Sequence, residues 1–279
     1  AAIRNNHYKS WPGLDATIAS KYFPESHETW NGHGRKVKSG LRSTKALIKK
    51  EEDEVKGIKL EEEQAIYVKD FDLKDEADRM MFSDQTGRFP VTSFKGNQYV
   101  MVLFETIGNN ILVEPMRNRT SGQMVRAYQV LIDRMKEKGI VPTMHILDNE
   151  CSGEFKNAIT ENKMKYQLVP PNDHRRNVAE KAIQTFKDHF VSVLCGTDDN
   201  FPLQLWCQLL RQAEHQLNML RKSRAVPSMS AFEHMYGKHS YDAHPWAVLG
   251  SEIEVHVMPA QRRTWASHTK KGYYLGTSW

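Results

Sequence analysis

Three acidic residues stand in segments that a folded core would hold rigid. Asp84 ends the segment MMFSD, Asp148 follows the apolar run MHIL, and Glu180 lies in AEKAIQTF, where apolar residues recur at helical spacing. Mg²⁺ and Mn²⁺ prefer carboxylate oxygens, and two such ions about 3.5 to 4 Å apart promote phosphoryl transfer. Each acid alone is more often a turn residue or a solvated helix residue. Their joint placement predicts one shared metal site.

The segments around these acids predict an α/β core, because helical and extended patterns alternate after an antiparallel meander. We expect a mixed sheet of about five strands with helices on both faces. The predicted strands are 80–84, 98–105, 110–116, 143–147 and 165–169, and the predicted helices are Thr120 or Ser121 to Gly139, 154–163, 175–194 and 202–221.

The helix predicted over 175–194 is amphipathic. Its apolar residues form one stripe, and Glu180, Gln184 and Lys187 lie at i, i+4 and i+7 on an adjoining polar face. One face of this helix is therefore buried, and the other can look into a site.

Two basic segments are candidates for contact with nucleic acid. Arg175 and Arg176 stand before the apolar stripe of the helix predicted over 175–194, which starts at Ala179. A solvated basic turn is the plain alternative, and contact with DNA phosphate is the hypothesis we favour. Residues 35–50 carry seven Lys or Arg and no acid before the charge reverses in EEDE. For that segment a solvated linker is preferred over a phosphate grip.

Composition sets the limits within which these motifs act. The chain has 279 residues, of which 39% are hydrophobic and 26% charged, as in an ordinary globular protein. No apolar run approaches a membrane span, and no signal peptide is visible. The net charge of +5 permits a polyanionic partner. The sequence does not predict a zinc site, because no cysteine precedes Cys151 to join His7, His27 and His33. A start without Met is expected of a segment of a longer polyprotein.

The segments SDQTGRF, LDN with GEF after it, and RRNVAEKAIQTFK together resemble the integrase catalytic core of LTR retrotransposons. The Ty1/copia-like Pol polyproteins are the nearest match within that group, which is related to retroviral integrases. The resemblance covers roughly Met81 to Lys222 and continues more weakly through WAVLGSEIEVHV and TWASHTKKGYYLG. It implies a ribonuclease H-like fold and a D,D,E triad of Asp84, Asp148 and Glu180 that holds two Mg²⁺ or Mn²⁺ ions.

The same resemblance implies an enzyme that trims the 3′ ends of an element and joins them to target DNA. It implies DNA and further copies of the chain as partners, no membrane, and a nuclear location with a possible cytoplasmic particle stage. Lys187 matches a helix position that faces the element's DNA end in relatives, and Asn177 matches the Asn of an Asn-Gly pair. Two departures, DNE in place of DNG and Val178 in place of Gly, keep two alternatives open. These are a catalytically inactive or domesticated nucleic-acid-binding module and a ribonuclease H-like nuclease.

The sequence divides into three expected regions, of which the second is the catalytic core at 76–222. Residues 1–75 form a poorly ordered N-terminal region and charged linker, and 223–279 form a small β-rich extension. Three further acids compete for the site. These are Glu154, Glu105 and Glu150. We interpret Glu154 as compensation of a helix dipole and Glu105 as a less favoured fourth acid.

Overall fold

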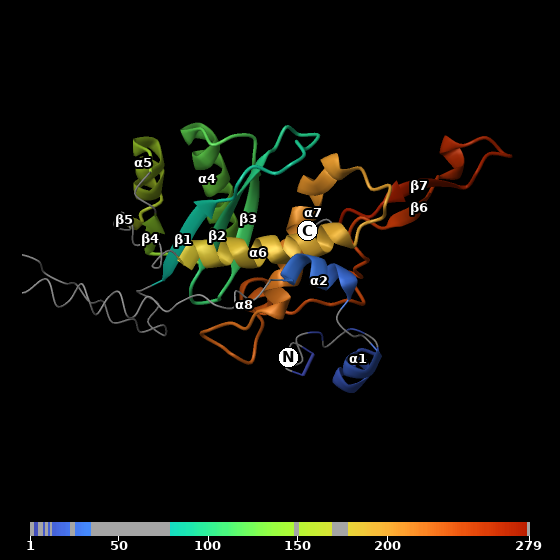
Figure 1. The fold of residues 1–279 in the computed structure, drawn as a ribbon, viewed down its shortest axis with the longest axis horizontal. Coiled ribbons are helices and arrows are strands. Elements are labelled where there is room, and N and C mark those ends of the chain that lie inside the picture. The colour runs from blue at the N-terminus through green and yellow to red at the C-terminus, as the bar shows by residue number, and fades with distance from the viewer. Residues whose placement is uncertain are drawn as a thin grey trace, which may run out of the picture. The chain divides into compact units, whose positions relative to one another are not determined.

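In the computed structural model, a mixed five-stranded sheet has the strand order β3-β2-β1-β4-β5 (Figure 1). The central strand β1 (Met80–Gln85) pairs antiparallel with β2 (Tyr99–Glu105), which pairs antiparallel with β3 (Ile111–Met116). On the other side of β1, β4 (Met144–Leu147) and β5 (Lys165–Leu168) follow in parallel. The predicted fold class, an α/β fold whose mixed five-stranded sheet has an antiparallel meander and a parallel half, is confirmed.

The structure describes residues 13–22, 26–34, 79–147, 151–168 and 178–277, together with Ile3, Arg4, Tyr8 and Trp11. All of these except Gly34 belong to one compact unit. Several predictions concern residues outside this set, namely those on the basic run 35–50, on His7, on Asp148 and Glu150, and on Arg175, Arg176 and Asn177.

Helices cover both faces of the sheet, as predicted. The helices α4 (Ser121–Glu137) and α5 (Gly153–Glu161) bury one face with strand residues such as Met81 and Leu103. The helices α6 (Val178–Cys195) and α7 (Trp206–Leu220) bury the other face with residues such as Phe82 and Val102. This division follows from the alternation of side chains along a strand.

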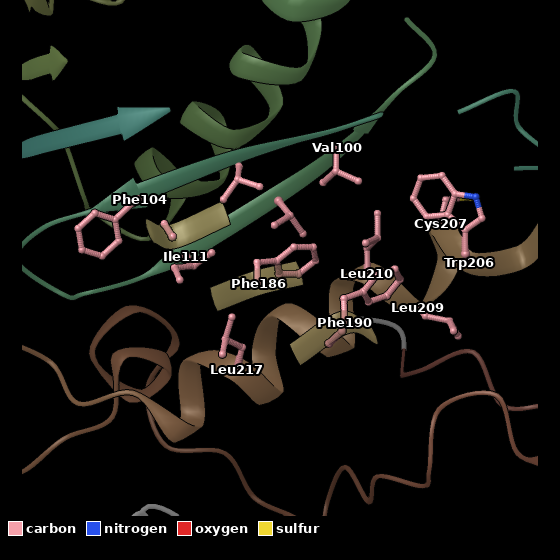
Figure 2. Close-up of a cluster of buried hydrophobic side chains, with 14 of the residues drawn as sticks. Val100, Phe104, Ile111, Phe186, Phe190, Trp206, Cys207, Leu209, Leu210 and Leu217 are labelled. Carbon is pink, nitrogen blue, oxygen red and sulfur yellow. The ribbon is translucent and has the colours of Figure 1, made fainter. Parts of the chain in front are cut away.

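The core on the α6 side is rich in aromatic side chains (Figure 2). Phe186 and Phe190 of α6 stack with ring centroids 5.6 Å apart, and both pack against the face of the sheet that α6 and α7 cover. Trp206, at the start of α7, has no exposed surface and stacks on Phe89 at 4.4 Å. The packing of Phe186 and Phe190 holds α6 against the sheet, which sets the position of the backbone that carries its polar face.

The outer edge of β3 receives hydrogen bonds from side chains of α7. Asn218 binds both the N–H and the carbonyl of Ile111, at 2.9 and 2.8 Å. One turn earlier, the fully buried Glu214 accepts from Val113 N at 2.8 Å and forms an ion pair with Arg134 of α4. An edge strand presents unpaired backbone groups, and here α7 satisfies them.

Smaller elements flank this core. Residues 1–34 show little periodicity, yet α1 (Ala16–Tyr22) and α2 (His27–His33) form there, and α2 packs on α6. After α7 comes α8 (Ala231–Tyr236), followed by β6 (Glu252–His256) and β7 (Thr269–Tyr273), which pair as the β-rich tail was predicted to do. A 3₁₀ turn, η3 (Leu203–Leu205), precedes α7, and a second one, η4 (Pro259–Gln261), follows β6.

Within the described residues, no helix has the length and apolar character needed to cross a membrane.

Candidate active site

Asp84 lies near the end of β1, opposite Val102 of β2. Met80 and Phe82 of the same strand pack in the core on the α6 side, and alternation along the strand assigns Asp84 to that side as well. Its side chain is half-buried, and Oδ1 accepts a 2.7 Å hydrogen bond from Gln85 N. The structure therefore holds this carboxylate on the central strand, as the sequence predicted.

Glu180 lies in the first turn of α6 and is exposed. Its neighbours Ala179 and Ala182 are buried, and α6 packs against β1 and β2. Asp84 and Glu180 thus belong to elements in direct contact. A carboxylate in a first turn also interacts favourably with the helix dipole, which stabilises Glu180 at this position.

Asp148 and three of the predicted DNA contacts, Arg175, Arg176 and Asn177, lie outside the described residues. The last described residue before Asp148 is Leu147, at the end of β4. The geometry of the complete triad is therefore still a prediction.

Gln184 and Lys187 occupy the polar side of α6, as the spacing predicted. Gln184 is half-buried and its Nε2 donates to Asp188 Oδ1 at 2.5 Å, one turn further along the helix. Lys187 is exposed, two turns beyond Glu180. Gln184 is therefore engaged within its own helix, whereas Lys187 presents an ammonium group at the surface.

The competing acids have structural roles. Glu105 is 1% exposed and accepts hydrogen bonds from Ile107 N at 2.6 Å and Gly108 N at 2.8 Å, which close the turn between β2 and β3. Because β1 and β2 are antiparallel, with Glu105 opposite Met81, this carboxylate lies toward the start of β1, away from Asp84. Glu154 lies in the first turn of α5, which agrees with compensation of the helix dipole.

A buried polar pair beside the candidate site was not found by sequence reasoning. Ser83 Oγ on β1 and His145 Nε2 on β4 are 2.8 Å apart, on the face of the sheet that α4 and α5 cover. His145 stacks on Tyr128 at 5.3 Å, and burial lowers its pKa to about 3. The imidazole is therefore neutral near pH 7 and joins β1, which carries Asp84, to β4, which precedes Asp148. Alternation in MHIL could have indicated that His145 points into the core.

The donor atoms suit a hard divalent cation. Asp84 and Glu180 offer carboxylate oxygens, which Mg²⁺ and Mn²⁺ prefer to nitrogen or sulfur. No cluster of three or more His, Cys, Asp or Glu able to hold a metal occurs within the described residues, which leave out Asp148. His27, one of the three histidines considered for zinc, lies in α2, where its Nδ1 is hydrogen-bonded to Asn31 Nδ2 at 3.2 Å.

Neither a protein-family model nor a curated protein sequence matches the chain. Among solved structures, it resembles the catalytic core of BIV integrase, with a TM-score of 0.42, 17% identity, and coverage of 57% of this chain and 93% of that one. It also resembles the magnesium complex of the HTLV-2 integrase catalytic core in its trimeric form, with a TM-score of 0.43, 17% identity, and coverage of 57% and 97%. A third similar chain is from a simian T-cell lymphotropic virus intasome bound to PP2A regulatory subunit B56 gamma, with a TM-score of 0.46, 15% identity, and coverage of 70% and 67%. Likenesses at this level say nothing about activity.

Proposed function

We propose that this chain is a metal-dependent polynucleotidyl transferase of the integrase type, which trims the 3′ ends of a mobile element and joins them to target DNA. The supporting observation is the parallel pairing of β1 and β4, in which Phe82 lies opposite Ile146. Asp84 and Asp148 each follow two positions later. Since Phe82 and Ile146 both pack on the α6 side of the sheet, the same alternation would direct both acids toward the helix that carries Glu180.

Asp84, Asp148 and Glu180 would hold two Mg²⁺ or Mn²⁺ ions. When bound, such ions stabilise the attacking and leaving oxygens of a phosphoryl transfer. The chain's own contribution would be to hold Asp84 on β1 and Glu180 on α6 and to position the DNA. Lys187 is suited to the DNA backbone because it is exposed on the polar side of α6, and Arg175, Arg176, Asn177 and Gln184 are proposed to contact DNA nearby.

The proposed activity also suggests the setting in which the chain works. Its partners would be the element's ends, target DNA and further copies of the chain, and it would act on chromosomal DNA in the nucleus after a cytoplasmic particle stage. The core at 76–222 would carry the chemistry, with 1–75 and 223–279 as flanking regions. A source in a Ty1/copia-like element is part of this proposal.

The proposal is tested by Mn²⁺-dependent strand transfer on an oligonucleotide carrying an element end. Asp148→Asn should abolish joining without changing the circular dichroism spectrum, because it removes a metal ligand but keeps the side-chain volume. Glu154→Gln is the matched control, since it changes a nearby carboxylate that we assign to the dipole of α5, and it should retain activity.

Two other results would point to other functions. Released nucleotides without joined strands would identify a hydrolytic nuclease of the same fold. Salt-sensitive DNA binding without any metal-dependent cleavage would identify an inactive nucleic-acid-binding module. Full strand transfer by Asp148→Asn would refute the assignment of the triad.

A further inference from the structure

A groove of about 570 Å³ lies between the loop that follows β1 and the outer part of α6. Phe89 and Pro90 line it from the loop, and Phe186, Phe190 and Val191 line it from α6. Its size falls within the range of about 300–1,000 Å³ that is usual for ligand pockets. We call this feature the α6 groove.

The walls of the α6 groove are fixed before any ligand arrives. Trp206 Nε1 donates to Val91 O at 2.9 Å and so anchors the loop, while the Trp206 ring stacks on Phe89. Arg119 donates to the carbonyl of Thr86 at 2.7 Å, and Thr86 N donates to Val100 O at 2.9 Å. A ligand would therefore lose little binding free energy in ordering this wall.

The charges around the α6 groove favour an anionic ligand. Arg88 and Lys187 are both exposed and both line the groove. Among the lining residues that the structure describes, none is Asp or Glu. A second copy of this chain, whose net charge is +5, is a poorer electrostatic match than a polyanion.

The α6 groove adjoins the candidate active site. Thr86, which lines it, follows Asp84 by two residues and so lies on the same side of the extended chain. Lys187 lies two helical turns from Glu180, a rise of about 10 Å along α6. A DNA strand with its scissile phosphate at the acids would therefore reach the groove within a few nucleotides.

We propose that the α6 groove binds an unpaired base of a DNA strand, whose phosphates lie against Arg88 and Lys187. Apolar and aromatic walls suit the faces of a base, and every base offers such a face. A fully paired duplex hides these faces in its stack, so the groove distinguishes frayed or overhanging ends from blunt ones. This inference rests on the proposed function, which supplies DNA as the substrate and places its scissile phosphate at the acids.

The test compares two duplexes of one sequence, one blunt and one with a short single-stranded thymidine overhang, bound to the full chain in EDTA. The overhang should bind roughly tenfold more tightly, as stacking of a single base allows. Val191→Trp should remove this preference and keep the binding of the blunt duplex, because Val191 is 41% exposed and the larger side chain fills the groove. Val141→Trp is the matched control, since Val141 is 51% exposed but does not line the groove, and it should leave the preference unchanged.

A footprint on Cys195 gives an independent readout. This thiol is exposed and lines the α6 groove, whereas Cys207 is buried; Cys151 is replaced by Ser for the experiment. The overhang duplex should slow the alkylation of Cys195 by N-ethylmaleimide, and the blunt duplex should not.

Equal affinity and equal protection with the two duplexes would overturn the groove proposal. Protection of Cys195 that rises with protein concentration in the absence of DNA would also overturn it, in favour of a contact between copies. Failure of the proposed function has a different signature, namely absence of strand transfer with Mn²⁺ while the preference for the overhang persists.

Discussion

Acidification from pH 7 to pH 5 should destabilise the fold through His145. This imidazole has no exposed surface, stacks on Tyr128, and is paired with Ser83 at 2.8 Å. Burial lowers its pKa from 6.5 to about 3. Protonation in the folded state would place a charge between β4 and the helices above it, where water cannot solvate that charge.

The size of the effect follows from proton linkage. The folded-state pKa of His145 lies below the unfolded-state value, so the unfolded chain takes up the proton first as the pH falls. The contribution of His145 is fully present above pH 6.5 and is lost between pH 6.5 and about pH 3. One pKa unit corresponds to about 1.4 kcal/mol, so at pH 5 the loss is about 2 kcal/mol. Total stabilities are about 5–15 kcal/mol, which makes this loss measurable.

Urea unfolding at pH 7 and pH 5, on the wild-type chain and on His145→Gln, isolates this contribution. Glutamine retains a hydrogen-bonding group that can face Ser83 but cannot take up a proton in this range. Between the two pH values, the wild type should lose about 2 kcal/mol more unfolding free energy than the variant. Equal losses in the two proteins would show that His145 is not buried as a neutral group.

Three further predictions concern packing and the assignment of acids. Glu214→Ala should lower the free energy of unfolding by about 3–5 kcal/mol, because it leaves the largely buried guanidinium of Arg134 unpaired. A loss below about 1 kcal/mol in urea titration would contradict that network. Gly32→Ala should lower Tm, because the added Cβ would lie 2.4 Å from a backbone carbonyl oxygen of α6. In Gly122→Ala the added Cβ would meet no atom within 4 Å, so this variant should stabilise α4 by up to about 1 kcal/mol. Equal Tm values for the two glycine variants would argue against the packing of α2 on α6. Glu105→Gln should reduce stability but leave strand transfer intact, and loss of activity in a folded variant would move this acid into the site.

Elements with strong local signals could be predicted from the sequence. Apolar residues at intervals of three and four specify α4, which begins at Ser121 after Thr120 and is followed by Gly139 in a left-handed conformation. The antiparallel meander follows from short apolar runs separated by Gly and Asn. Asp84 and Glu180 lie on the strand and the helix to which these patterns assign them.

Features that depend on contacts between distant segments could not be predicted. Glu214 lies in the helix predicted over 202–221, and it is fully buried there because its carboxylate accepts a hydrogen bond from Val113 N on the free edge of β3. The pairing of Ser83 with His145 likewise depends on the parallel registration of two strands. The start of α8 does have a local sequence signal, because Ser230 followed by Glu233 is a capping-box pattern. In the structure, Ser230 Oγ accepts a hydrogen bond from Glu233 N.

The central claim is that Asp84, Asp148 and Glu180 bind two metal ions together. Anomalous diffraction from crystals of the chain soaked in Mn²⁺ measures this directly. We predict two peaks about 3.5 to 4 Å apart, bridged by these three carboxylates. Absence of peaks at Asp84, or Asp148 and Glu180 carboxylates that lie more than about 8 to 10 Å from it, would contradict the account, because one pair of ions cannot span that separation.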